Sequence, residues 1–301
     1  MSAPDASVRT PARSVRRILS PGLLFAAPFL VLFALFMVWP LVQGLWMSLT
    51  DTSLSAHAPS FIGFDNYTEA FGDAEMWRTV GHTLLFTLLS TVPLVAVSLG
   101  MALLVYTGLP GQWVWRLAFF APYLLPVGVV GLLWMWLYQP DLGLYNHLLS
   151  ALGLDGYAWL SDESVALWAI VLATLWWTVG FNFLLYLAAL QSIPDHLYEA
   201  AAIDGAGAWR RLVSITLPQL SRITGVITVL QILASLKVFD QVYLLTKGGP
   251  NGSTRPVIEY VYDIGFTGYR LGYASAISYV FFAIVILASV AQLTAFRRRE
   301  K

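Results

Sequence analysis

The sequence has no cysteine and little charge. The absence of cysteine among its 301 residues excludes disulfide bonds, thiol catalysis and thiolate metal sites. Only 11% of the residues are charged, whereas an average soluble domain has about 25%. The formal net charge is zero, so no general attraction to nucleic acid follows. Because 58% of the residues are hydrophobic, the chain is predicted to be an integral membrane protein.

Motifs for enzymatic chemistry are also missing. The sequence contains no G-x-x-x-x-G-K-[ST] loop to hold nucleotide phosphates and no G-x-S-x-G motif of serine hydrolases. Its four histidines lack the H-E-x-x-H spacing of zinc enzymes. These absences argue against an intramembrane enzyme. They also mean that any ATP-driven activity requires ATP to be bound and hydrolysed on another chain.

Long uncharged runs dominate what is present. Because about 20 residues cross a bilayer as a helix, these runs predict six transmembrane helices in one all-α domain, residues 18–296. An arm (1–17) precedes this domain and a tail (297–301) follows it. The spans are expected at about 22–46, 81–106, 115–138, 164–190, 221–245 and 272–296.

The basic residues predict the orientation of the chain. Arginine and lysine collect on the cytoplasmic side of membrane proteins. With both termini in the cytoplasm, 12 of the 17 basic residues fall on that side. Lys237 and Asp240 lie near the outer end of the fifth predicted span. They are expected to form a local ion pair, and a role in gating is the alternative.

A polar stretch at residues 193–218 separates the fourth and fifth apolar runs. Residues 199–202 are strong helix formers with little bulk, so another protein surface can approach them closely. Gly205 tolerates the backbone angles of a bend. Helical spacing resumes over residues 209–217, and Pro218 is expected to end that helix. The prediction is two short helices joined by a turn, outside the membrane core.

The same stretch fits the pattern E-A-A-x3-G-x9-I-x-L-P at every fixed position. In this respect the chain resembles the membrane subunits of binding-protein-dependent ABC importers. The resemblance implies the type I importer permease fold and makes residues 193–218 the coupling loop, which sits in a cleft of a cytosolic ATPase subunit. The expected coupling residues are Glu199, Ala200, Ala201, Asp204, Gly205, Ile215, Leu217 and Pro218. An ordinary interfacial hairpin is the alternative.

Polar side chains inside the predicted spans indicate a solute pathway, because burying them in hydrocarbon is costly. Gln231 and Ser235 are four residues apart and therefore share a face of the fifth span. The same spacing recurs on the fourth span at Thr174, Thr178 and Asn182. Tyr123 lies between Pro122 and Pro126, which disturb helical hydrogen bonding. The alternative is that these side chains serve helix–helix packing.

Two further strings, residues 236–250 and 175–194, look like those of sugar permeases of the maltose-permease type. Aromatic rings such as Trp176 and Trp177 also suit the apolar faces of sugars. The predicted substrate-pathway residues are Tyr123, Val127, Trp177, Thr178, Asn182, Gln231, Ser235 and Val238. Valine replaces polar residues of the maltose pattern at some of these positions, so maltose specificity is not supported.

The resemblance also implies an assembly. The chain would form half of a pathway for a di- or oligosaccharide, or a related polyol phosphate, in the inner membrane of a prokaryote. Its partners would be membrane lipid, a second permease, two ATPase subunits carrying ATP and magnesium, and an extracytoplasmic sugar-binding protein. No cofactor is expected in this chain. The alternative is a stand-alone secondary transporter or channel, with Lys237 and Asp240 as an ion site.

Overall fold

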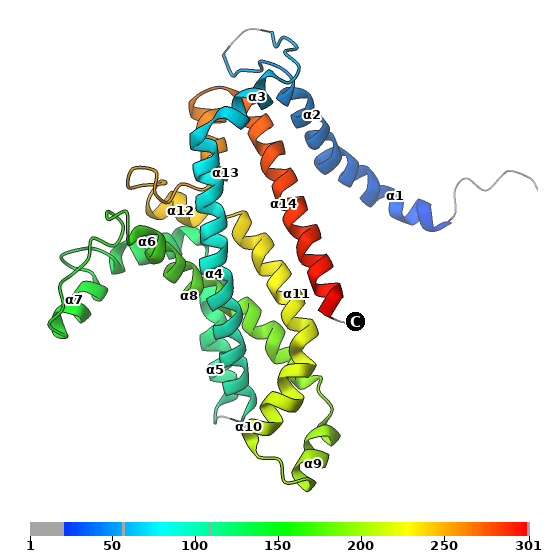
Figure 1. Ribbon diagram of the computed structural model, residues 1–301, viewed down its shortest axis with the longest axis vertical. Helices are drawn as coiled ribbons and strands as arrows, with labels where there is room; N and C mark the ends of the chain where they lie inside the picture. Colours follow the sequence, from blue (N-terminus) through cyan, green and yellow to red (C-terminus); the bar gives the residue numbers. More distant parts are fainter. Residues whose placement is uncertain (1–20, 56–57, 109, 300–301) are drawn as a thin grey trace, which may run out of the picture. The chain divides into compact units, whose positions relative to one another are not determined.

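The computed structural model describes residues 21–55, 58–108 and 110–299 (Figure 1). Within these residues all regular secondary structure is helical, apart from one isolated β-bridge between Thr50 and Phe61. The all-α prediction is therefore confirmed. The chain divides into two units, Met1–Trp46 and Met47–Lys301. The predicted arm, 1–17, and the end of the predicted tail, 300–301, lie outside the described residues.

The first unit consists of one apolar helical run. It contains α1 (Pro21–Phe33), a π-helical turn (Ala34–Val38) and most of α2 (Trp39–Ser48). Together they give a candidate membrane span at Phe25–Ser48. Apolar side chains such as Phe29 and Phe36 are exposed along it. An exposed apolar helix is the form that a lipid environment favours, because its backbone groups bond within the helix.

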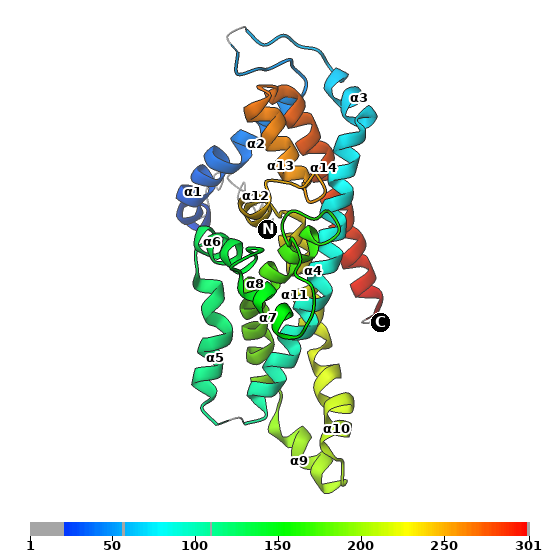
Figure 2. The same cartoon turned by 90° about the vertical axis from the view of Figure 1, so that its left-hand side faces the viewer.

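The second unit is built around α4 (Ala74–Tyr106), the longest helix among the described residues. It packs along α8 (Ala166–Gln191) and α11 (Leu217–Leu236), as Figures 1 and 2 show. Asp73 caps α4, because its carboxylate accepts hydrogen bonds from the backbone N–H groups of Glu75 and Met76. The helix consequently begins seven residues before the expected 81–106.

The third apolar run is a broken span. It contains α5 (Gln112–Phe120), a 3₁₀ turn (Ala121–Leu124) and α6 (Val127–Leu137), with a bend of 98°. The predicted span at 115–138 therefore contains a sharp break. Pro126 causes the break, since a proline disfavours helical angles in the residue before it. Leu125 is accordingly extended, with ψ of 136°.

The fifth helix is displaced along the sequence from the expected 221–245. It runs from α10 (Ala208–Arg211) through a π-helical turn (Leu212–Thr216) into α11 and ends at Leu236. Pro218 does not end it, contrary to expectation. The N–H of Leu217 bonds to the carbonyl of Leu212, five residues back. This wider turn accommodates a proline that would clash in a regular α-helix.

Shorter helices cap both ends of the second unit. Figures 1 and 2 place α9 (Asp195–Ile203) and α10 at one end, and α3 (Asp65–Gly72) and α13 (Val257–Tyr262) at the other.

The remaining helices are α7 (Leu144–Ala151), α12 (Asp240–Leu245) and α14 (Leu271–Arg299). Among the described residues, five helices are long and apolar enough to cross a membrane, or six with the bent pair. This agrees with six predicted spans.

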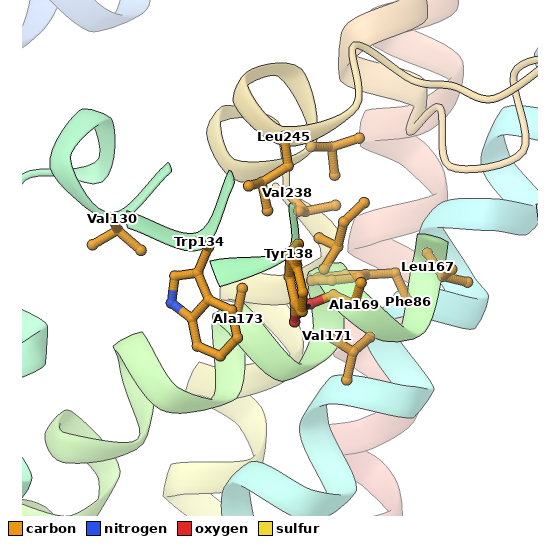
Figure 3. Close-up of a cluster of buried hydrophobic side chains, with 12 residues drawn as sticks. Phe86, Val130, Trp134, Tyr138, Leu167, Ala169, Val171, Ala173, Val238 and Leu245 are labelled. Atoms are coloured by element: carbon orange, nitrogen blue, oxygen red, sulfur yellow. Dashed lines mark hydrogen bonds between the residues drawn. The ribbon is translucent and has the colours of Figure 1, made fainter. Parts of the chain in front are cut away.

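Aromatic residues hold α6 against α8. Figure 3 shows Trp134 over Ala173, and Tyr138 beside Ala169. The Tyr138 hydroxyl donates a hydrogen bond of 2.8 Å to the Ala169 carbonyl. Both rings are almost completely buried. These contacts fix the direction in which α6 leaves the bend.

Candidate functional site

A cavity of about 320 Å³ lies where the two interrupted apolar runs of the second unit meet. Its lining comes from α4, the 3₁₀ turn, α8, α11 and α12. The lining residues are Phe86, Tyr123, Thr174, Trp177, Thr178, Phe181, Asn182, Leu230, Gln231, Ala234, Ser235, Lys237, Val238, Asp240 and Gln241. They combine aromatic faces, amides, hydroxyls and two charges.

Both helix interruptions open onto this cavity. Tyr123 lies in the turn between α5 and α6, and Lys237 and Val238 lie between α11 and α12. Non-helical backbone at membrane depth is tolerated only where protein buries it or where it lines a cavity. Transporters use such discontinuous helices to form solute sites. The cavity is therefore the strongest candidate for a solute site among the described residues.

A chain of side-chain hydrogen bonds forms the polar wall of the cavity. The Asn182 amide donates to Gln231 Oε1 at 2.8 Å, and the Gln231 amide donates to Ser235 Oγ at 3.1 Å. Ser235 Oγ in turn lies 2.9 Å from Ser90 Oγ on α4. The chain links α8, α11 and α4. Because each buried amide has a fixed partner, its remaining hydrogen-bonding atoms point in defined directions.

Two threonines of α8 contribute mainly acceptor oxygens. The hydroxyls of Thr174 and Thr178 each donate to a backbone carbonyl four residues earlier, at 2.8 Å. Their hydrogens are therefore used within the helix, and lone pairs remain for other groups. Gln241 of α12 makes a long contact of 3.5 Å from its amide to Thr174 Oγ1. That weak contact leaves the Gln241 amide available to a ligand.

Another part of the lining is aromatic. The rings of Tyr123 and Phe181 stack with centroids 5.5 Å apart, and Tyr123 remains 39% exposed. Trp177 donates its ring N–H to the carbonyl of Leu125 at 3.1 Å. Trp177 therefore braces the bend and offers the cavity only its ring surface. Stacked faces beside hydrogen-bonding groups suit a solute with apolar C–H patches and polar edges.

The structure brings most of the predicted pathway residues together. Those lining the cavity are Tyr123, Trp177, Thr178, Asn182, Gln231, Ser235 and Val238. Val127, which begins α6, is not among the described lining residues. Trp176 packs against Trp134 instead, with ring centroids 5.8 Å apart. The roles of these residues remain predictions.

Sequence reasoning missed several lining residues and misplaced two charges. No sequence pattern indicated that Phe86, Phe181 or Gln241 would line a cavity, although Phe181 directly precedes the predicted residue Asn182. Lys237 follows the end of α11 and Asp240 begins α12, so they do not share a helix. No ion pair joins them in the described part of the chain, and the predicted local pair is therefore wrong.

The second predicted site, residues 193–218, forms a helical hairpin. After α9, the N–H of Ala206 bonds to the carbonyl of Ala201, and the N–H of Gly205 to that of Ala202. These two bonds form a Schellman motif, which needs a left-handed residue after the helix. Gly205 supplies it with φ of 73°. The turn expected at Gly205 is thus present.

The hairpin presents mostly exposed residues. Glu199, Ala200 and Asp204 are exposed, and Ile203 is 88% exposed. The Tyr198 hydroxyl lies 2.9 Å from the Thr216 hydroxyl, which ties α9 to the start of the fifth helix. An exposed apolar side chain at the tip of a braced hairpin is typical of a protein contact surface.

Polar residues tie the helices together at the end opposite the hairpin. Asp73 accepts hydrogen bonds from the hydroxyls of Tyr260 (2.5 Å) and Tyr273 (2.7 Å). Burial alone would raise the pKa of Asp73, but these bonds and its two backbone N–H donors lower it. Glu69 and Arg270 form a two-pronged ion pair at 2.6–2.7 Å. These contacts join α3, α4, α13 and the start of α14.

Glu259 of α13 is a buried carboxyl at this same end. It is 2% exposed, and its Oε2 has no hydrogen-bond partner. Burial, with a smaller contribution from Asp263, raises the pKa of Glu259 to about 7, against the opposing effect of Arg255. Arg255 itself pairs with Asp263 at 2.8 Å. Glu259 is thus about half protonated in a neutral medium.

Comparison with known proteins gives consistent matches. Residues 83–300 match the family model described as binding-protein-dependent transport system inner membrane component. The chain is 36% identical over 280 residues to the sulfoquinovosyl glycerol transport system permease protein SmoG of Agrobacterium fabrum, covering 93% of this chain and 91% of that one. It is 35% identical over 283 residues to the trehalose/maltose transport system permease protein MalF of Thermococcus litoralis, covering 93% and 94%.

A solved structure matches over nearly the same length. It is the crystal structure of a bacterial alginate ABC transporter in complex with an alginate pentasaccharide-bound periplasmic protein. The TM-score is 0.80 at 25% identity, over 93% of this chain and 96% of that chain.

Proposed function

The chain belongs to the family of binding-protein-dependent transport system inner membrane components, and from this premise we propose that it forms half of the translocation pathway of an ATP-driven carbohydrate importer. The resemblance inferred from its sequence is thereby confirmed. The protein is a transport subunit in the inner membrane, and its transport depends on a binding protein. The proposed solute is a di- or oligosaccharide or a related polyol phosphate.

The observation that carries the proposal is the cavity at the two helix interruptions. Gln231 and Ser235 contribute fixed hydrogen-bonding groups to its lining, and Tyr123 and Phe181 contribute aromatic rings. This combination matches a carbohydrate, whose hydroxyls lie at the edge of the ring and whose C–H groups lie on its faces. A second permease of similar fold would supply the other half of the pathway.

The continuous fifth helix supplies a physical route for coupling. This helix is continuous from Ala208 through the π-helical turn to Leu236, so it joins the hairpin to Gln231 and Ser235. At 1.5 Å per residue, the 20 residues from Arg211 to Gln231 span about 30 Å. A rotation imposed on the hairpin would therefore displace the polar wall of the cavity.

ATP chemistry belongs to partner chains in this proposal. Two copies of a cytosolic ATPase would hold ATP and magnesium, and each would receive a hairpin such as residues 193–218. Closure of the two copies would draw the hairpins together and turn the cavity from the inner to the outer side, where the binding protein releases its sugar. Both chain termini would lie in the cytoplasm, on the side of the hairpin.

The direct test is purification from native membranes in mild detergent, followed by identification of the co-purifying chains and reconstitution in liposomes. The expected result is an ATPase, a second permease and a binding protein, with sugar uptake that requires ATP. Uptake by the chain alone, driven by an ion gradient, would overturn the proposal and favour a secondary transporter.

A further inference from the structure

Lys237 and Asp240 are the only charged residues among the described residues that line the cavity. Both side chains are exposed, and neither forms an ion pair in the described structure. Both residues lie at the interruption between α11 and α12, so a solute in this cavity is within reach of both charges.

Each charge is stabilised by its own position in the backbone. Lys237 follows the last residue of α11, a helix of 20 residues whose unpaired carbonyls favour a cation. Asp240 is the first residue of α12, where unpaired N–H groups favour a carboxylate. The two side chains therefore do not need each other as partners. Both remain available to a solute.

On the basis of the proposed function, we propose that Lys237 and Asp240 select an uncharged polyhydroxylated solute over an anionic one. A sugar hydroxyl can both accept and donate a hydrogen bond. The Lys237 ammonium offers three donors, and the Asp240 carboxylate offers only acceptors. Hydrogen bonds to charged groups are roughly twice as strong as those between neutral groups. Neighbouring hydroxyls of one sugar can therefore satisfy both side chains.

An anionic solute fits this arrangement less well. A sulfonate or phosphate drawn to Lys237 would stay close to Asp240, since three residues separate their Cα atoms by at most about 11 Å. The two formal charges of the lining cancel. Among the relatives, one is named for trehalose and maltose, which are neutral, and another for sulfoquinovosyl glycerol, which carries a sulfonate. The balanced charge of this lining favours a solute of the neutral kind.

Lysine labelling of the assembled complex gives a direct test. The chain has three lysines, Lys237, Lys247 and Lys301. Lys247 is exposed and lies outside the cavity lining, so it is a matched internal control. Reductive methylation would be followed by mass spectrometry, with the binding protein present, in trehalose, maltose or diacetylchitobiose and separately in sn-glycerol 3-phosphate.

The neutral sugars should slow methylation of Lys237 about tenfold at ten times their dissociation constant, with Lys247 unchanged. Protection by sn-glycerol 3-phosphate alone would overturn the assignment to neutral solutes. Failure of every sugar to protect Lys237 would remove it from the solute site.

Uptake by variants separates this inference from the proposed function. Lys237→Gln and Asp240→Asn should each raise the KM for a neutral sugar about tenfold, through loss of one charged hydrogen bond. Lys247→Gln should behave as wild type. Unchanged KM in the first two variants, with ATP-driven uptake intact, would refute the inference alone. Absence of ATP-driven uptake in the wild-type assembly would instead refute the proposed function.

Discussion

Replacing Gly205 should uncouple ATP hydrolysis from transport while the membrane helices remain folded. Gly205 has φ of 73° and closes the Schellman motif after α9. A Cβ built at this position meets no heavy atom within 4 Å. The cost of a substitution is therefore conformational and not steric. Substitutions at Gly205 therefore change the turn without creating a steric clash.

The magnitude follows from the backbone angle. A left-handed conformation costs a residue with a side chain roughly 1–2 kcal/mol, so Gly205→Ala should reduce the population of the native turn by a factor of about 5 to 30. Gly205→Pro is more severe, because proline fixes φ near −65°. It also removes the N–H that bonds to Ala202. Gly205→Asn should lie between wild type and alanine, since asparagine tolerates this region.

The assay is paired measurement of ATP hydrolysis and sugar uptake in liposomes containing the whole assembly. The ratio of sugar imported to ATP hydrolysed should fall in the order wild type, asparagine, alanine, proline. Gly207→Ala is the matched control, because Gly207 has φ of −66° and its Cβ would also meet nothing within 4 Å. Wild-type coupling in Gly205→Pro, or an equal defect in Gly207→Ala, would show that the turn at Gly205 does not determine coupling.

Three further outcomes are expected. Gly180→Ala should reduce the thermal stability of the purified protein, since the new Cβ would lie 2.5 Å from the Phe119 carbonyl oxygen; an unchanged melting temperature would contradict the close packing of α8 on α5. Gln231→Leu should raise the KM for sugar about tenfold by leaving Asn182 and the solute without a partner, and unchanged uptake would count against the polar wall. The pKa of Glu259 rises from 4.5 to about 7 in the folded state. The free energy of unfolding should therefore be highest below about pH 4.5 and fall by up to about 3 kcal/mol as the pH rises through 7. Thermal unfolding of Glu259→Gln between pH 5 and 8 should lack this pH dependence.

Hydropathy and charge predicted the number of spans because crossing a bilayer requires long uncharged runs. Run length does not reveal where the backbone bends within a span. Pro122 and Pro126 signalled disturbance in the third run, but not a bend of 98°. The interruption after Leu236 contains no proline and had no comparable signal. Lys237 and Asp240 were consequently read as an ion pair on one helix.

The coupling hairpin was more predictable than the cavity. Its turn depends on a local requirement, a left-handed residue at Gly205, which one glycine satisfies. The cavity depends on contacts between helices distant in sequence, such as Ser90 with Ser235. The spacing of polar residues placed Gln231 and Ser235 on one face but could not show that Ser90 joins them. Pro218 was misread because a π-helical turn, invisible in the sequence pattern, precedes it.

Cross-linking from the hairpin tests most directly the claim that this chain couples to a separate ATPase. The chain has no native cysteine, so Ile203→Cys, at a position 88% exposed on α9, gives a single reactive site in this subunit. Leu152→Cys, at a position 76% exposed beyond α7, is the matched control. We expect a cross-link from position 203 to the ATPase, with a yield that changes with bound nucleotide, and none from position 152. Cross-linking of position 203 only to lipid or to another copy of this chain would contradict it.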